Sequence, residues 1–388
     1  MEIIIAPDKF KGSMTATEAA QAIARGLNSN FPDTRLKLFP LSDGGEGLVE
    51  AIAGAAGGSI LTKTVSNPLE GKTEASWALI NNGRCAVIEM SAASGLSLLP
   101  PESRNPGVTS TYGTGELIRA ALEEGCSEII IGIGGSATND GGAGMAYALG
   151  AKLLDKDGRQ LEPGGLELLK LERIDISSLD SRIANISIKV ACDVDNPLTG
   201  PHGASYVYGP QKGAGPEMVR QLDRALAHYA EILKGATGTD VEMIPGAGAA
   251  GGLGAGLIAF LGAELHSGID LVLDTLNIDQ HLDKADLLIT GEGHLDKQSL
   301  RGKAPVGIAR RAKKYGLPVL ALAGAVEIDS EDMHKAGITA AFSITDGPMN
   351  LEEALNRGAE LLEKKAAALI YFFRTATKNP GGLNRQGY

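Results

Sequence analysis

The sequence predicts an α/β protein in which the two ends of the chain complete one Rossmann-like, doubly wound domain and the middle forms an inserted mixed α/β domain. Two observations predict this arrangement. Strand, loop and helix patterns alternate at both ends of the chain, and the pattern between them changes to neighbouring strands. A length of 388 residues also exceeds what a single hydrophobic core usually supports.

The first part of the chain has the pattern of two strand, loop and helix units of a parallel sheet. Thr15 is followed three residues later by Glu18, a spacing typical of a capping box at the start of a helix. The apolar runs before the loops are strand-sized. The expected elements are strand 2–6, a helix after Thr15, strand 36–41 and helix 47–56.

From about residue 58 the pattern changes to alternating apolar and polar positions. Three such segments are joined by short turn-rich links, which predicts an antiparallel meander and the start of a second domain. Helical and buried-strand patterns follow. The expected elements are strands 60–65, 73–80 and 84–90, helix 113–124, and strands 128–133 and 189–192.

The C-terminal part returns to alternating strands and helices. The expected elements are strand 285–290, helix 304–315, strand 318–323, helix 331–336, strand 339–344 and helix 351–372. The predicted domains are therefore a discontinuous Rossmann-like domain of residues 1–60 and 284–374, an inserted domain of residues 61–283, and a loose tail of residues 375–388.

The composition argues against two classes of partner. The formal net charge is −11 and no Lys/Arg cluster supplies the concentrated positive surface that a phosphate backbone needs, which argues against a nucleic-acid partner. No apolar run approaches the roughly 20 residues that span a bilayer, so we expect no membrane segment. The chain opens on an apolar run and Asp8, without the basic stretch and long apolar core of a secretion signal, so we expect a cytoplasmic location.

Glycine is the most informative residue type. Glycine accounts for 52 of the 388 residues, well above the average usage of roughly 7%. These glycines cluster with carboxylates in loops that follow predicted strands. Ligands of open α/β sheets lie beyond the carboxyl ends of the strands, so these loops are the candidate ligand sites. They comprise residues 8–13, 42–47, 132–142, 192–200 and 290–303.

Phosphoryl transfer needs the mixture of groups that these loops supply. Backbone donors and cations surround the phosphates, carboxylates hold Mg²⁺, and a positioned base accepts a proton. Lys9 and Lys11 flank an aromatic residue at the end of a strand, which favours phosphate or carboxylate binding. Lys303 precedes a helix, where an anion would relieve the conflict between a cation and the helix dipole. Each loop alone also fits an ordinary turn, but five together favour a ligand site.

Two familiar nucleotide motifs are not matched. Gly71-Lys72-Thr73 lacks the earlier glycine of a Walker A loop, because Ser66 stands at that position. Gly132-Ile133-Gly134 is followed by Ala137 where a dinucleotide fingerprint has its third glycine. Segment 246–256 consists mostly of small residues at the start of a predicted apolar helix. These residues either allow tight helix packing or form a wall of the substrate pocket.

Taken in order, the loops resemble the bacterial glycerate kinase family, the type built from two α/β domains. The matching motifs cover nearly the whole chain, to about residue 372. They are Ala6-Pro7-Asp8-Lys9-Phe10-Lys11-Gly12-Ser13, Ser42-Asp43-Gly44-Gly45-Glu46-Gly47, Gly134-Gly135-Ser136-Ala137-Thr138-Asn139-Asp140-Gly141-Gly142, residues 193–200, and Thr290-Gly291-Glu292-Gly293 with Asp296, Gln298, Ser299, Gly302 and Lys303.

The resemblance implies ATP-dependent phosphorylation of D-glycerate with Mg²⁺, and the 2-hydroxyl is the expected acceptor. The implied partners are the small molecules D-glycerate and ATP, with a homodimer left open. The implied roles are ATP binding by Gly291, Glu292, Gly293, Asp296, Ser299 and Lys303; substrate binding by Lys11, Gly134, Gly135, Ser136, Asn139 and Asp140; metal binding by Asp43, Glu46 and Asp140; and catalysis by Asp193, Asp195, Lys9 and Asp43. Asp193 or Asp195 is the candidate general base or metal ligand, because a carboxylate fits either role.

Two other functions remain open at this point. The Rossmann-like ends also fit an NAD(P)-dependent dehydrogenase of a small hydroxy acid, although no dinucleotide fingerprint follows the first strand. A non-enzymatic regulator that binds a sugar acid would use the same loops without turnover. The many carboxylates near the anion site weigh against such a binding protein.

Overall fold

The computed structural model describes residues 1–378 and divides into two compact units. Unit 1 comprises residues 1–42 and 272–378, and unit 2 comprises residues 43–271. The boundaries differ from those expected near residues 60 and 283. One reason is that α2 (Leu48–Ala56) packs on the sheet of unit 2, and another is that α10 (Asp279–Leu282) packs on α11 (Ala304–Lys313) of unit 1. Within residues 1–378, no helix is both long and apolar enough to cross a membrane.

Unit 1 contains a five-stranded parallel sheet with the strand order β13-β12-β11-β1-β2. Strand β1, which pairs with a strand on each side, buries Ile3, Ile4 and Ile5 completely, as expected for a parallel strand covered on both faces. The strands are β1 (Glu2–Pro7), β2 (Arg35–Leu38), β11 (Leu287–Leu295), β12 (Val319–Val326) and β13 (Ala340–Ser343); the other helices are α1 (Ala16–Asn30), α12 (Ser330–Lys335), α13 (Leu351–Asn356) and α14 (Gly358–Lys378).

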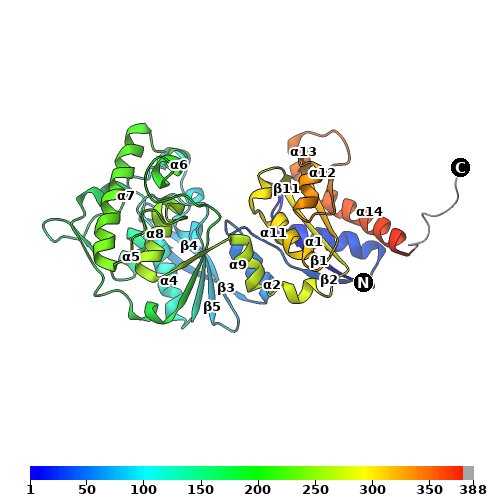
Figure 1. Cartoon of the computed structure of the whole chain (residues 1–388), viewed down its shortest axis with the longest axis horizontal. Coiled ribbons are helices and arrows are strands. Elements are labelled where there is room, and N and C mark those ends of the chain that lie inside the picture. Colours follow the sequence, from blue (N-terminus) through cyan, green and yellow to red (C-terminus); the bar gives the residue numbers. More distant parts are fainter. Residues whose placement is uncertain (379–388) are drawn as a thin grey trace. The chain divides into compact units, whose positions relative to one another are not determined.

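The two ends of the chain meet within unit 1. Helix α1, blue in Figure 1, and α14, red, pack side by side. Gly26 permits this approach, because a Cβ at this position would lie 2.2 Å from the carbonyl oxygen of Glu363. Arg25 also forms a 2.7 Å ion pair with Glu363. The α/β character expected for the two ends of the chain is therefore confirmed.

Two expected boundaries in unit 1 are wrong. Strand β11 continues to Leu295 instead of ending at Thr290, because Gly291 and Glu292 remain paired with β12. The segment expected as a tail from residue 375 is helical as far as Lys378, the end of α14. The rest of the predicted tail, residues 379–388, lies outside the described residues.

Unit 2 contains a six-stranded mixed sheet with the order β10-β9-β6-β5-β4-β3. Strands β3, β4 and β5, consecutive in the chain, pair antiparallel, which confirms the expected meander. The other strand pairs of this sheet are parallel. The strands are β3 (Ser59–Ser66), β4 (Lys72–Ile80), β5 (Cys85–Glu89), β6 (Glu128–Gly132), β9 (Ser187–Ala191) and β10 (Glu264–His266), with a separate two-stranded antiparallel sheet of β7 (Lys152–Leu154) and β8 (Arg173–Asp175). The other helices are α3 (Ser91–Ser94), α4 (Tyr112–Glu123), α5 (Ala143–Ala148), α6 (Ala204–Tyr208), α7 (Pro216–Thr237) and α8 (Ala249–Leu261), with α9 (Gly268–Thr275) crossing the unit boundary.

The glycine-rich start of α8 is not a regular helix. Ala250, Gly251 and Gly252 have left-handed φ angles of 53°, 69° and 89°. Ala250 is strained there, because a non-glycine residue in this region costs roughly 1–2 kcal/mol. Gly251 is packed so closely that a Cβ would lie 2.0 Å from the carbonyl oxygen of Thr138. This irregular turn therefore lies against the predicted loop 132–142.

The capping box that the sequence predicts is present at the start of α1. The Thr15 side chain accepts a hydrogen bond from the Glu18 amide at 3.2 Å, and the Glu18 carboxylate accepts one from the Thr15 amide at 2.8 Å. Replacing Thr15 with Ala should lower the free energy of unfolding by about 1 kcal/mol, because a helix N–H loses its acceptor. Urea denaturation measures this change. Thr17→Ala, inside the first turn, is the matched control and should be neutral or slightly stabilising; an equal loss in both variants would contradict the capping argument.

Candidate active site

An open pocket of about 390 Å³ lies in unit 2 at the carboxyl ends of β6 and β9. These strands are adjacent and parallel, so the chain after each strand reaches the same edge of the sheet. Three of the segments predicted from sequence line this pocket, namely residues 43–45, 134–136 and 192–194. The other lining residues are Leu96, Ile133, Ala191, Tyr208, Gln211, Ala249 and Ala250.

Close backbone packing holds these segments together. Gly44 has a left-handed φ of 92°, and a Cβ there would lie 2.6 Å from the Cβ of Ala191. Gly268, at the start of α9, is equally confined: a Cβ would lie 2.1 Å from the Asp43 carbonyl oxygen and 2.8 Å from Asp193 Oδ2. Only glycine allows both approaches, so these two positions set the spacing between the loops.

Asp193 is a carboxylate of the pocket lining whose pKa is raised. The residue is exposed to the open pocket, but neighbouring protein atoms crowd its carboxylate and reduce its hydration. This desolvation is the main cause that raises the pKa of Asp193 to about 6, and the negative charges of Asp43 and Asp270 raise it further. The Gly268 amide donates to Asp193 Oδ1 at 2.8 Å, which opposes the shift and fixes the orientation of the side chain. A carboxylate held in this way is poised to accept a proton near neutral pH.

Asp195, the other acid considered for this role, does not line the pocket. Its side chain is exposed on the same loop, two residues beyond Asp193. The structure therefore separates two carboxylates that the sequence left equivalent.

Asp140 lies beneath the pocket loop and does not face the pocket. It is 1% exposed. Its carboxylate accepts four hydrogen bonds, from the amide and hydroxyl of Thr111 and from the amides of Gly142 and Gly144. Burial raises the pKa of Asp140, while these hydrogen bonds act in the opposite direction. The structure therefore gives Asp140 the place of a loop anchor, which differs from the substrate and metal roles expected from sequence.

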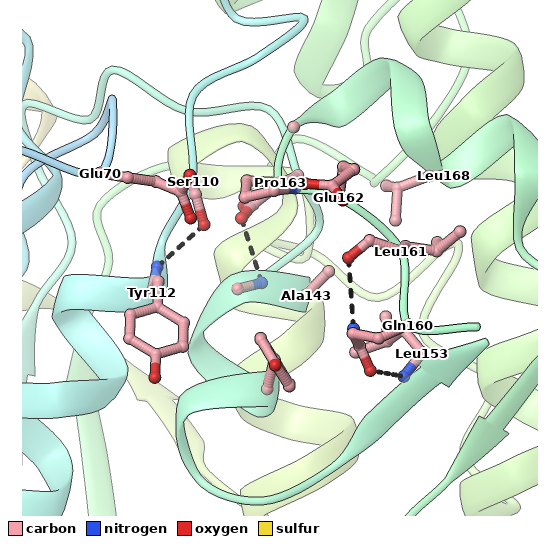
Figure 2. A pocket seen from close by; sticks show the side chains of 14 residues that line it. Glu70, Ser110, Tyr112, Ala143, Leu153, Gln160, Leu161, Glu162, Pro163 and Leu168 are labelled. Atoms are coloured by element: carbon pink, nitrogen blue, oxygen red, sulfur yellow. Dashed lines mark hydrogen bonds between the residues drawn. The ribbon is translucent and has the colours of Figure 1, made fainter. Parts of the chain in front are cut away.

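Asp140 is among the lining residues of a second, much smaller cavity, and Figure 2 shows this cavity with ten of its other lining residues labelled. Ser110 accepts a hydrogen bond from the Tyr112 amide there, and Gln160 accepts one from the Leu153 amide. The cavity measures about 40 Å³, which suits a few ordered waters but not an organic substrate. We therefore place the candidate site in the larger pocket.

The three residues expected to bind a metal are not brought together. Asp43 lines the large pocket, Glu46 is exposed outside its lining, and Asp140 is buried as described above. Among residues 1–378, no group of three or more His, Cys, Asp or Glu side chains has the arrangement of a metal site. The alternation of glycine and acid in the sequence does not reveal this separation, because it carries no information on which way each side chain points.

Glu89 is a site-forming residue that the sequence did not suggest. It is 8% exposed, and its Oε1 accepts hydrogen bonds from the amides of Gly47 and Val49 at 3.1 Å and 2.8 Å. These amides form the N-terminus of α2, which a carboxylate stabilises. The turn 43–47 is thus held by a protein carboxylate at its helix end, and only its first three residues line the pocket.

Ser136 and Asn139, both expected to bind substrate, have different surroundings. Ser136 lines the pocket, as do Gly134 and Gly135. Asn139 is fully buried, and its Nδ2 donates to Ser205 Oγ at 3.0 Å. Sequence reasoning also missed Lys212, whose Nζ donates to Ser136 Oγ and to the Thr138 carbonyl, both at 2.7 Å. An isolated lysine between Gln211 and Gly213 carries no sequence pattern that would have identified it.

The lysine-bearing loop after β1 lies beside β11 in unit 1. The Asp8 amide donates to the Gly291 carbonyl at 2.8 Å, and a Cβ at Gly293 would lie 3.3 Å from the Lys11 amide nitrogen. Lys9 is half-buried and Lys11 is exposed. Lys11 thus lies with the residues expected to bind ATP, and not with the other residues expected to bind substrate.

The remaining residues expected to bind ATP form two local arrangements. Lys303, the N-cap of α11, pairs with Glu292 at 3.2 Å, and loss of hydration raises the pKa of Glu292. Oε1 of Glu292 is buried without a hydrogen-bond partner in the described part of the chain. Asp296 Oδ1 accepts from the amides of Gln298 and Ser299, which forms a tight turn, and Ser299 is fully buried within it. Of this set, Gly293, Asp296 and Lys303 retain partial exposure.

Comparison with known proteins gives a consistent result. Residues 3–374 match the sequence profile of the glycerate kinase family. The chain is 53% identical over 359 residues to the glycerate 2-kinase of Escherichia coli K12, which covers 92% of this chain and 94% of that one. It is 50% identical over 366 residues to the glycerate kinase of Bacillus subtilis 168, which covers 94% and 96% of the two chains.

A solved structure extends the similarity to the fold. The crystal structure of a protein from Salmonella typhimurium LT2, provisionally named glycerate kinase 2, superposes with a TM-score of 0.89 at 47% identity. The match covers 97% of this chain and 99% of the other.

The packing at Gly268 predicts a stability defect. In Gly268→Ala the new methyl group would meet the Asp43 carbonyl, so the loops must move apart, and we expect the free energy of unfolding to fall by about 1–3 kcal/mol. Gly54→Ala in α2 is the matched control. Its Cβ would meet nothing within 4 Å, so helix propensity should make that variant more stable by about 0.5–1 kcal/mol. Chemical denaturation of both variants checks this, and an undiminished stability of Gly268→Ala would contradict the close packing.

Proposed function

Because this chain belongs to the glycerate kinase family, we propose that it transfers the γ-phosphoryl group of ATP to D-glycerate, at the 2-hydroxyl, to form 2-phosphoglycerate. The resemblance recognised in the loop motifs is thereby confirmed at the level of the family. The choice of the 2-hydroxyl follows the relative from E. coli, which is named a glycerate 2-kinase.

The observation that carries the proposal is the pocket at Asp193. It combines a carboxylate whose pKa is raised to about 6 with a serine hydroxyl and glycine-rich backbone, in a volume of about 390 Å³ that accommodates a three-carbon acid. Phosphoryl transfer leaves little covalent chemistry to the protein and depends on positioning and charge.

We assign Asp193 the role of general base. It accepts the proton of the attacking hydroxyl, and its bond from the Gly268 amide keeps the carboxylate oriented toward the acceptor. Asp43 and the backbone of residues 134–136 complete the substrate side of the pocket in this proposal.

For ATP we propose the carboxyl edge of the parallel sheet in unit 1, read as a Rossmann-like doubly wound sheet. The support is the strand order. Strands β1 and β11 are neighbours, but the next strand after β1 is β2 on one side of this pair, and the next strand after β11 is β12 on the other side. Ligands of such sheets bind at this switch point. Lys9, Lys11 and Lys303 supply cations for the phosphates there.

Mg²⁺ fits the proposed chemistry through one carboxylate and the phosphates rather than through a cage of protein ligands. Kinase sites commonly use one or two carboxylates together with phosphate oxygens, and Asp43 is the lining carboxylate suited to this. When bound, the ion supplies positive charge that offsets the charge of the phosphoryl group.

A cytoplasmic location and a homodimer are further predictions that accompany the proposal. The relatives named above support a metabolic kinase, and none of them is named a dehydrogenase or a regulator.

The activity is tested directly by incubating the purified protein with Mg-ATP and D-glycerate. ³¹P NMR should identify 2-phosphoglycerate together with ADP. Appearance of 3-phosphoglycerate would overturn the regiochemistry. A change at the nicotinamide absorbance band with glycerate and NAD(P) would favour the dehydrogenase, and glycerate binding without ADP release would favour the regulator.

The role of Asp193 predicts a large effect on turnover. Asp193→Asn should lower kcat by about 10²–10⁴-fold, because the amide accepts no proton. The folded protein should be no less stable at pH 8, since a raised pKa means that the ionised carboxylate disfavours the folded state above pH 6.

Asp195→Asn is the matched variant on the same loop, and its kcat should stay within about threefold of the wild type. Steady-state kinetics of the two variants decide the assignment. A folded Asp193→Asn protein with near-normal kcat would remove Asp193 from the reaction.

The proposed ATP site predicts a selective change in KM. Lys303→Met should raise KM for ATP by roughly tenfold or more through loss of a charged donor, while KM for glycerate stays nearly constant. Lys297→Met is the matched control, because Lys297 is exposed on the same segment and lies outside the proposed site. An equal rise in both KM values for Lys303→Met would point to general disruption instead.

A further inference from the structure

Lys212 is a buried cation immediately behind the pocket. It is 1% exposed, at the end of a short helical turn Pro210–Lys212. Its Nζ donates to Ser136 Oγ and to the Thr138 carbonyl oxygen, both at 2.7 Å. Ser136 and Gln211 line the pocket, so the ammonium group is separated from it by one side chain.

This charge is not balanced by an ion pair. Within residues 1–378, Lys212 Nζ donates to the Ser136 hydroxyl and the Thr138 carbonyl, both neutral, and the charge of Asp140 acts on it without a hydrogen bond. Burial lowers the pKa of Lys212 to about 7, and only the charge of Asp140 acts in the opposite direction. A buried ammonium without a carboxylate partner destabilises a fold, so its presence needs another explanation.

The pocket offers that explanation. Its lining, within the described residues, contains the carboxylates of Asp43 and Asp193 and no Lys, Arg or His side chain. Both acids repel a substrate that is itself a carboxylate. Because Ser136 Oγ accepts from Lys212, the serine keeps its O–H hydrogen to donate into the pocket, and the ammonium polarises that donor.

We propose that Lys212 is a positioning residue which, acting through Ser136, draws the carboxylate of the substrate to the Ser136 end of the pocket. This inference rests on the proposed phosphorylation of glycerate. With the carboxylate held there, the hydroxyls of the substrate are left for Asp193. Lys212 is thereby a determinant of specificity for acids over uncharged alcohols.

The test uses Lys212→Met, which keeps the length of the side chain and removes its charge. KM for D-glycerate should rise about 10- to 100-fold, as expected for loss of a charge-assisted interaction, while KM for ATP stays within about twofold. Inhibition by glyceramide, the uncharged analogue, should change little. Lys234→Met, which removes an exposed lysine of α7 in the same unit, is the control and should alter neither KM.

The wild-type protein supplies a second measurement that needs no variant. KM for glycerate should rise about tenfold between pH 7 and 8.5, as Lys212 loses its proton, whereas any change near pH 6 reports the ionisation of Asp193. Asp140 is the charged group that acts on Lys212, and burial raises the pKa of the nearby Tyr229, which therefore stays neutral over this range. The rise should be absent in Lys212→Met.

The outcomes separate the two proposals. A wild-type protein that does not phosphorylate glycerate overturns the proposed function. An active wild type with an unchanged KM for glycerate in Lys212→Met overturns the role of Lys212 alone, as does an equal rise of both KM values. If Lys212→Met does not fold, the wild-type pH profile decides, and a constant KM for glycerate from pH 7 to 8.5 overturns the inference.

Discussion

Close backbone packing of loops that carry glycine is the constraint on which the candidate site depends. Gly44 lies against Ala191, and Gly268 lies against both Asp43 and Asp193, at distances that no Cβ could occupy. The same contact places the Gly268 amide 2.8 Å from the carboxylate that we assign as base. The absence of side chains at these two positions therefore sets both the spacing of the loops and the orientation of the Asp193 carboxylate.

Buried polar groups support this arrangement from beneath. Asp140 ties its own loop to Thr111 through four hydrogen bonds, and Lys212 holds Ser136 and the Thr138 carbonyl. Buried polar networks are favourable only when their members are satisfied, and they then make one conformation unique. In the proposed site, the positive charge of Lys212 therefore lies behind the pocket surface instead of on it, in a protein of net charge −11.

Much of the fold could be predicted because it depends on local patterns. The capping box at Thr15 follows from the spacing of Thr15 and Glu18, and the meander from β3 to β5 and the alternation at both ends follow from the pattern of apolar residues. The position where β11 ends could not be read in this way, because pairing with β12 carries the strand through Gly291 and Glu292 although glycine usually marks a turn. The unit boundary near residue 42 depends on which sheet α2 packs against, which the sequence of α2 does not state.

By itself the sequence determined the α/β class, the family and the loops in which the chemistry lies, because these depend on composition, periodicity and the order of motifs. Only the tertiary structure decided which side chains in those loops face the pocket. It turned Asp193 toward the pocket and left Asp195 outside it, buried Asp140 as an anchor, and brought Lys212 behind Ser136 from 76 residues away. The physical reason is that the direction of a side chain and its loss of hydration depend on packing between distant segments, which no local pattern encodes.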